Sequence, residues 1–334
     1  MSIVKPILLF FALTLAAPGQ PLFRVADSEI SSSPTLIAYG DMRFTDPKET
    51  NATNPKVRRW LVDRIAAEKP DAVLLSGDIP WNGNITNDYV VYQAETASWR
   101  AAHMLILPAL GNHEFHGELQ LCLNNWWNAF PNLRGHRWYS VALGSRIFVL
   151  NLDSNSSLLP DSEQSAWIKA QLASLPSSVQ FVFLNLHHPP LADVQAKPDD
   201  DHNPRANEIA LADLLKAASK NLRFVVCAGH IHNYERFIQD GIVYLVSGGG
   251  GAKPRPVVRE LSDQYRDEDF PNYHYVKLAL NGNHLNVDMI RVADAQAETP
   301  SWQLKDRFEV PMPCALPKTM KTLSCSPARQ RADR

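Results

Sequence analysis

The sequence AVLLSGD at residues 72–78 sets the pattern from which the fold can be predicted. An apolar run ends there at a glycine, and an acidic residue follows directly. Short apolar runs bounded by turn residues are typical of buried strands. Because the loops at the carboxyl ends of strands in α/β sheets face a common crevice, we expect Asp78 at a ligand-binding edge.

Other polar segments follow strand-like runs in the same way. In chain order the set is Asp41, Gly77-Asp78, Gly111-Asn112-His113-Glu114, His187 and Gly229-His230-Ile231-His232. Side chains placed in this way can converge although they are far apart in the sequence. Carboxylate, amide and imidazole groups are ligands of first-row ions such as zinc, manganese and iron. The ordered set therefore predicts a metal site.

Hydrophobic periodicity predicts an alternation of strands and helices. The expected strands are 35–39, 72–76, 104–107, 147–152, 181–186, 224–228 and 243–247, and the expected helices are 56–68, 89–100, 162–174 and 207–220. This alternation indicates an α/β fold. Residues 273–290 instead predict a β-hairpin that turns at residues 281–283. A mixed sheet, or two packed sheets with outer helices, is expected from this change.

The ordered polar segments resemble the metal-binding blocks of the calcineurin-like metallophosphoesterase superfamily, which includes the purple acid phosphatases. The family pattern is Asp-x-His, Gly-Asp, Gly-Asn-His-Glu/Asp, a lone His and Gly-His-x-His. The chain departs from it in the first block, where Arg43 stands at the histidine position. The resemblance implies a four-layer αββα sandwich, in which two mixed β-sheets are flanked by helices.

The resemblance also implies how the site residues are used. Asp78 would bridge two ions. One ion would take Asp41 and His232, and the other Asn112, His187 and His230. The implied cofactor is one or two divalent or trivalent ions of iron, manganese or zinc. The implied reaction is hydrolysis of phosphate monoesters or diesters by a metal-bound hydroxide, with His113 as proton donor to the leaving oxygen.

Two adjacent histidines compete for one ligand position. The lone histidine of the family is usually followed two residues later by proline, and both His187 with Pro189 and His188 with Pro190 fit. We favour His187 as the ligand because it lies closer to the end of the apolar run 181–186. His188 would then face the substrate.

Arg43 is the departure with chemical consequences. A guanidinium cannot coordinate a cation, and a +1 group about 5 Å from a +2 ion costs roughly 6 to 7 kcal/mol at an effective dielectric of 20. Purple acid phosphatases use a tyrosine three residues after the bridging aspartate, but Trp81 stands there. Two roles for Arg43 stay open: it grips the substrate phosphate, or it replaces part of the first ion's role.

The charge balance bears on the partners of the protein. A formal net charge of −2 supplies no basic field for a nucleic-acid backbone. We expect a small phosphorylated substrate and no nucleic acid. The alternative function is a non-catalytic, exported protein that binds phosphate or a phosphorylated ligand at a degenerate metal site. Substrate identity and oligomeric state are not predicted by these residues.

The two ends of the chain differ from the middle. Residues 1–20 predict a signal peptide, with Lys5 before an apolar run and small residues after it, so we expect export to the periplasm or the extracellular space. The apolar run is short for a stable membrane anchor, although a retained tether is the alternative. Residues 30–310 would form the phosphoesterase domain, and residues 311–334 a poorly ordered or disulfide-pinned tail.

Four cysteines fit an oxidising location. Cys314 and Cys325 are the expected bridge, and Cys227 is expected to be a buried free thiol. Six histidines, at positions 103, 116, 136, 202, 274 and 284, lie outside the ordered segments. We expect them at the surface or at the edge of the core, with His116 the nearest to the site.

Overall fold

Two β-sheets form the centre of the computed structural model, which describes residues 19–195, 202–219, 222–267 and 270–311. In the seven-stranded sheet, β6, β7, β9 and β11 are parallel neighbours, whereas β5 is antiparallel to β6 and parallel to β1, and β10 is antiparallel to β11. The sheet is therefore mixed. In spatial order its strands are β1 (Phe23–Val25), β5 (Tyr139–Leu143), β6 (Ile147–Asn151), β7 (Phe181–Asn185), β9 (Arg223–Ala228), β11 (Ile242–Ser247) and β10 (Tyr234–Gln239).

The six-stranded sheet is mixed as well. Its parallel strands β2, β3 and β4 continue into an antiparallel meander. In spatial order the strands are β15 (Trp302–Pro311), β14 (His284–Val292), β13 (His274–Asn281), β2 (Thr35–Tyr39), β3 (Ala72–Leu75) and β4 (Leu105–Pro108). A separate antiparallel pair consists of β8 (Val194–Gln195) and β12 (Val257–Val258).

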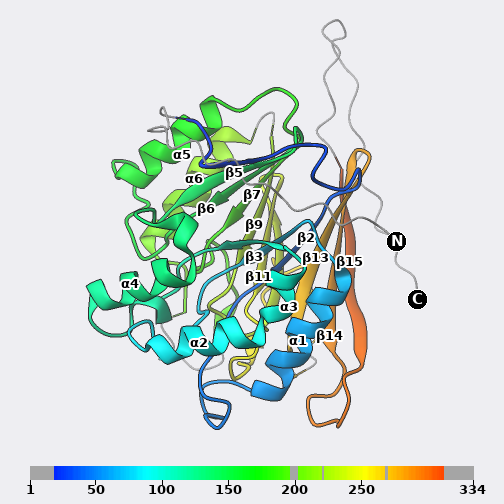
Figure 1. Cartoon of the computed structure of the whole chain (residues 1–334). Helices are drawn as coiled ribbons and strands as arrows, with labels where there is room; N and C mark the ends of the chain where they lie inside the picture. The colour runs from blue at the N-terminus through cyan, green and yellow to red at the C-terminus, as the bar shows by residue number, and fades with distance from the viewer. Residues whose placement is uncertain (1–18, 196–201, 220–221, 268–269, 312–334) are drawn as a thin grey trace, which may run out of the picture.

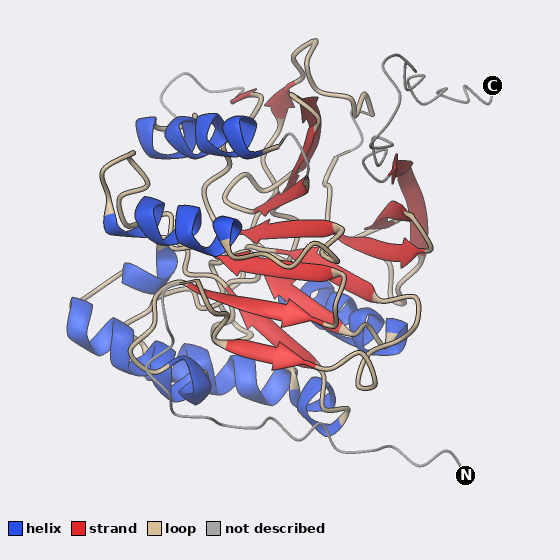
Figure 2. Ribbon diagram, turned by 90° about the horizontal axis from the view of Figure 1, so that it is seen from above, coloured by secondary structure: helices blue, strands red, loops and turns tan. Residues whose placement is uncertain are grey.

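Helices lie on both outer sides of the two sheets (Figures 1 and 2). The helices are α1 (Pro55–Glu68), α2 (Thr86–Glu95), α3 (Ala97–Ala101), α4 (Leu119–Ala129), α5 (Glu163–Ala173) and α6 (Ala206–Ala218), with 3₁₀ turns at His113–Phe115 and Pro131–Leu133. Helices α5 and α6 cover the seven-stranded sheet, and α1 to α3 lie on the side of the six-stranded sheet. This arrangement confirms the predicted α/β sandwich of two mixed sheets with flanking helices.

Alternation along single strands explains the layers. In β7, Phe181 and Phe183 join a core that includes strands of both sheets. Val182 and Leu184 point the other way and pack in a second core with residues of α5 and α6. The central strands β6, β7 and β11 are buried along their whole length, which is why they read as continuous apolar runs.

One predicted helix was wrong in its extent. The segment 89–100 was expected to be a single helix, but α2 ends at Glu95 and α3 begins at Ala97. The hydroxyl of Thr96 donates a 2.6 Å hydrogen bond to the carbonyl oxygen of Tyr92, which competes with the backbone ladder at that point. Helix α4 and strand β15 were not predicted.

Further predictions concerned the cysteines, the two ends of the chain and membrane spans. Cys227 is a buried free thiol, as predicted. The expected bridge between Cys314 and Cys325, residues 1–18 of the segment 1–20 that was predicted to be a signal peptide, and the tail beyond residue 311 lie outside the described residues. Within the described ranges, no helix has both the length and the apolar character needed to cross a membrane.

Candidate metal centre

The polar segments of the two sheets meet at their strand ends. Asp41, Asp78 and Asn112 follow β2, β3 and β4 of the six-stranded sheet, whereas His187, His230 and His232 follow β7 and β9 of the seven-stranded sheet. The backbone N–H of His230 donates to Oδ2 of Asp41 at 2.8 Å, across 189 positions of sequence. The structure therefore brings all six predicted ligand residues into one cluster.

Unusual backbone geometry aims several of these side chains inward. Asp41, Asp78 and His230 have φ angles of 64°, 54° and 71°, in the left-handed region. This conformation costs a non-glycine residue roughly 1 to 2 kcal/mol, and such strain concentrates at functional sites. Gly111 has no room for a side chain, because a Cβ there would lie 2.4 Å from Oδ1 of Asp78.

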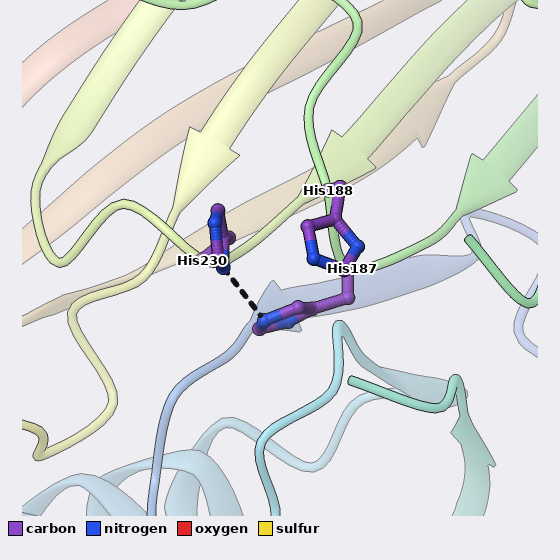
Figure 3. A group of neighbouring side chains, drawn as sticks. All are labelled: His187, His188 and His230. Carbon is purple, nitrogen blue, oxygen red and sulfur yellow. Dashed lines mark hydrogen bonds between the residues drawn. The ribbon is translucent and has the colours of Figure 1, made fainter. Parts of the chain in front are cut away.

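His187 and His230 point toward each other, with His188 beside them (Figure 3). The Nδ1 atom of His187 is 2.8 Å from the carbonyl oxygen of Ser76, so the ring proton is donated there and Nε2 presents a lone pair. Nε2 lies 2.9 Å from Oδ1 of Asn112, 3.3 Å from Oδ1 of Asp78 and 3.2 Å from Nδ1 of His230.

These separations fit ligands that share a cation. Two donor atoms about 2.0 to 2.1 Å from a tetrahedral ion are roughly 3.3 Å apart. Several acceptor atoms face one another around Nε2 of His187, and too few protons are available to pair them all. A divalent first-row ion would satisfy the nitrogen and oxygen donors together, so the residues present fit a metal ion at this position.

His188 occupies a different place from its neighbour. Its Nδ1 atom is 2.8 Å from the hydroxyl oxygen of Ser154, and its ring centroid is 4.4 Å from that of His230. Only His187 of the two also comes within 4.8 Å of carboxylate atoms from both Asp41 and Asp78. The geometry favours His187 as the shared ligand, with His188 beside it.

Asp41, whose carboxylate lies within 4.8 Å of Asp78, forms a second pair of donors with His232. Oδ1 of Asp41 and Nε2 of His232 are 3.4 Å apart, and neither has a hydrogen-bond partner among the described residues. Nδ1 of His232 is 2.7 Å from the carbonyl oxygen of Lys253, which leaves Nε2 as an acceptor. Two buried acceptors that face each other require a proton or a cation between them.

Burial controls the protonation of this cluster. It raises the pKa of Asp41 to about 7, although His187 and Arg43 act in the opposite direction. Burial also acts to raise the pKa of Asp78, but His187, His113 and Arg43 outweigh it and hold that pKa well below its usual range. Burial lowers the pKa of His232 well below its ordinary value. A neutral imidazole is the form that binds a metal.

Arg43 lies beside the central carboxylate. Its Nη2 atom donates to Oδ2 of Asp78 at 3.2 Å, and its side chain is only 11% exposed. The guanidinium carbon is 5.2 Å from the centroid of the Trp81 ring, a cation–π contact. Nε has no hydrogen-bond partner in the described structure. The guanidinium is therefore fixed at the site and keeps unused donors.

His113 lies in a stack of rings. Its centroid is 4.7 Å from that of Trp81 and 4.0 Å from that of His116. Nδ1 lies 2.6 Å from the carbonyl oxygen of Trp81, and Nε2 is 3.6 Å from Oδ2 of Asp78. Burial lowers the pKa of His113 to about 3. Because Nδ1 points to the carbonyl of Trp81, Nε2 is the nitrogen that faces the cluster and can exchange a proton there.

Two residues have roles at the site that were not predicted. The ring of His202 is stacked on that of His230, with centroids 4.5 Å apart, so its expected position away from the site was wrong. The buried carboxylate of Glu114 accepts hydrogen bonds from the backbone N–H groups of Asp78, Ile79 and Gly111. Glu114 lies within an ordered polar segment, but its role as a brace was not foreseen.

The glycines after β11 also border the centre. A Cβ at Gly248 would lie 2.1 Å from the carbonyl oxygen of Ile231, and one at Gly250 would lie 2.3 Å from that of Gly40. The backbone N–H of Gly250 already donates to Gly40. These glycines let two chain segments pass closely behind Asp41.

Comparison with known proteins places this centre in a family. The family model described as calcineurin-like phosphoesterase matches residues 40–234, which include every residue of the cluster. The chain belongs to the calcineurin-like phosphoesterase family, and it is a metallophosphoesterase by that membership. The family implies a dinuclear metal site. No protein with curated annotation matches the chain.

Solved structures share the fold at low identity. The purple acid phosphatase PPD1 of yellow lupin (Lupinus luteus) seeds aligns with a TM-score of 0.65 and 19% identity, over 85% of this chain and 54% of that protein. GAP50, the anchor in the inner membrane complex of Plasmodium, aligns with a TM-score of 0.60 and 13% identity, over 85% of this chain and 90% of that protein. The chain thus spans about half the length of the plant phosphatase.

Proposed function

We propose that the protein hydrolyses phosphate monoesters or diesters of small molecules with the help of iron, manganese or zinc. The observation that carries the proposal is the cluster around Nε2 of His187, where atoms of Asp78, Asn112 and His230 lie within 3.3 Å. Asp78, Asn112, His187 and His230 would hold one ion. When bound, metal lowers the pKa of a water and offsets charge on the phosphoryl oxygens.

The chain's own residues have separate tasks in this reaction. Arg43 donates N–H groups to a phosphoryl oxygen, since only one of its donors is used by Asp78. Without substrate, burial lowers the pKa of His113 to about 3, and its Nε2 carries no proton because Nδ1–H points to the carbonyl of Trp81. In this proposal Nε2 takes up a proton from solvent when the anionic substrate binds, and passes it to the leaving oxygen as the bond from phosphorus to that oxygen breaks. The contact of Nδ1 with the carbonyl of Trp81 orients the ring for this transfer. His188 faces the substrate beside the ligands.

One observation favours a second candidate. The ion pair with Arg43 partly neutralises the carboxylate of Asp78 and so lowers its affinity for a metal ion. This is expected for a phosphate-binding protein without turnover. The position of His113 beside Asp78 favours the hydrolase instead.

An assay with a chromogenic phosphomonoester and the matching diester, with added manganese, zinc or iron, separates the candidates. We expect metal-dependent turnover of at least one ester. Absence of turnover with every metal, together with tight binding of inorganic phosphate, would establish the binding protein.

Export is part of the proposal. It rests on the charged start, apolar run and small residues of positions 1–20. Expression of the full chain in a secreting host, followed by N-terminal sequencing of the mature protein, tests it. Recovery of uncleaved protein only within the cytoplasm contradicts it.

A further inference from the structure

The two oxygens of Asp78 face different groups. Oδ1 lies 3.3 Å from Nε2 of His187 and accepts the backbone N–H of His113 at 3.0 Å. Oδ2 lies 3.2 Å from Nη2 of Arg43. A carboxylate that bridges two ions must offer an oxygen to each, but here Oδ2 is already paired with a guanidinium.

Several contacts hold Arg43 in that place. Its backbone N–H donates to the carbonyl oxygen of Asp78 at 2.9 Å, its φ angle is 50°, and its guanidinium lies against the Trp81 ring. A side chain fixed by its backbone, by a ring and by an ion pair loses little entropy when it binds a ligand. Arg43 is therefore placed as a permanent charge rather than as a mobile surface group.

The charge balance disfavours two ions beside this guanidinium. The buried acids among the predicted ligands are Asp41 and Asp78. With Arg43, a single divalent ion exceeds their charge by one unit, whereas two divalent ions exceed it by three. Buried charge without compensation is strongly unfavourable. Among the described ligand residues, Oδ1 of Asp41 and Nε2 of His232 are the donors that remain without a partner for the second position.

We infer that Arg43 takes the place of one of the family's two metal ions, so that the centre holds a single tight ion and a guanidinium. The ion is held by Asp78, Asn112, His187 and His230. The guanidinium is the second cation, and it binds an oxyanion of the phosphoryl group through its unused N–H groups. This inference deepens the proposed function and relies on it only for the identity of the ligand.

Metal stoichiometry tests the inference without an activity assay. The full chain is loaded with excess manganese, dialysed against buffer that contains a mild chelator, and analysed for metal per chain by mass spectrometry. We expect one equivalent in the wild type and two in Arg43→His, which restores the family's imidazole. Arg59→His, at a side chain that is 49% exposed on α1, is the matched control and should stay at one. Two equivalents in the wild type, or one in Arg43→His, overturn the inference.

A spectroscopic measurement covers the case in which Arg43→His does not fold. Electron paramagnetic resonance of the manganese-loaded wild type should show the hyperfine pattern of an isolated ion. The signal of a coupled pair contradicts a single-ion centre.

The oxyanion role has its own readout. Titration of the manganese-loaded protein with inorganic phosphate should show at least tenfold weaker binding in Arg43→Gln, with metal content unchanged. If the phosphate affinity of Arg43→Gln is unchanged, the guanidinium does not bind the oxyanion. If the wild type binds one ion and phosphate but turns over no ester, the inference stands and the proposed hydrolysis fails.

Discussion

Nδ1 of His187, at the end of the seven-stranded sheet, lies 2.8 Å from the carbonyl oxygen of Ser76, at the end of the six-stranded sheet. This contact fixes the tautomer of His187 and turns Nε2 toward Asp78, Asn112 and His230. A backbone carbonyl that orients a ligating histidine is a common device of metal sites.

Removal of this imidazole should abolish the metal site. We expect His187→Ala to lose its tightly held ion and, for an active enzyme, to lose on the order of a thousandfold in kcat/KM, because a bound ion contributes several kcal/mol to the transition state. Metal analysis and steady-state kinetics measure both effects. His136→Ala, an exposed position, is the control. Wild-type metal content in His187→Ala contradicts the assignment.

His113 should matter most for poor leaving groups. A general acid contributes roughly 10² to 10⁴ to the rate, but a nitrophenolate leaves without help. We expect His113→Gln to lose about a hundredfold or more in kcat with an alkyl phosphate, and less than about tenfold with a nitrophenyl ester. Equal losses on both substrates would mean that His113 acts in binding or positioning rather than as the acid.

Glu114 should stabilise the loops that carry the site. Its carboxylate accepts three buried backbone N–H groups, whereas the amide of glutamine would turn an N–H toward at least one of them. We expect Glu114→Gln to lower the free energy of unfolding by about 2 to 3 kcal/mol, measured by urea denaturation. Glu118→Gln is the matched control.

The control alters a similar but exposed arrangement. Glu118 accepts the N–H groups of Gln120 and Leu121 at the start of α4, and we expect its substitution to cost less than about 1 kcal/mol. Equal losses in the two variants contradict the bracing role of Glu114.

Asp193 should make stability depend on pH. Burial, with a hydrogen bond to Asp263, raises its pKa to about 7. A carboxyl group with a raised pKa in the folded state favours folding while it is protonated. Its stabilisation is complete below the unfolded value near 3.8 and is lost as the pH rises toward about 7.

The substitution Asp193→Asn removes this dependence. Asparagine keeps an oxygen for the N–H of Glu260 and supplies an N–H to Asp263 without a titratable proton. We expect the midpoint temperature of Asp193→Asn to rise relative to the wild type between pH 4 and 7. Asp213→Asn, at an exposed position of α6, should show no such trend. Parallel pH profiles for the wild type and Asp193→Asn would rule out this linkage.

The predictable parts of the molecule share one cause. Strands buried on both faces carry continuous apolar runs, and the polar residue after each run marks the sheet edge. Asp41, Asp78, His187 and His230 could be found in this way. Helix α4 could not, since its apolar residues Leu119 and Leu121 are 53% and 42% exposed and blur the helical pattern. Strand β15 lies at a sheet edge, and three consecutive charged residues at positions 305–307 interrupt its alternation.

The orientation of the site histidines depends on backbone carbonyl groups, which every residue has. The carbonyl groups of Ser76, Trp81 and Lys253 orient three histidines, but a carbonyl group carries no signature in the sequence. His202 stacks on His230, but no hydrophobic run or ligand motif next to it in the sequence marks this contact. Spacing along the chain therefore predicts which residues gather, and only the fold determines how they are turned.

The division of the donors between the two sheets has a kinetic consequence. Asp78 and Asn112 come from one sheet and His187 and His230 from the other, so neither half alone can retain an ion. Metal must enter after the halves have docked, late in folding. A bound ion links the two sheets, and its bonds to the ligands of one sheet have to break before the halves separate. Loss of the ion and the first step of unfolding should therefore be the same event, with one shared rate.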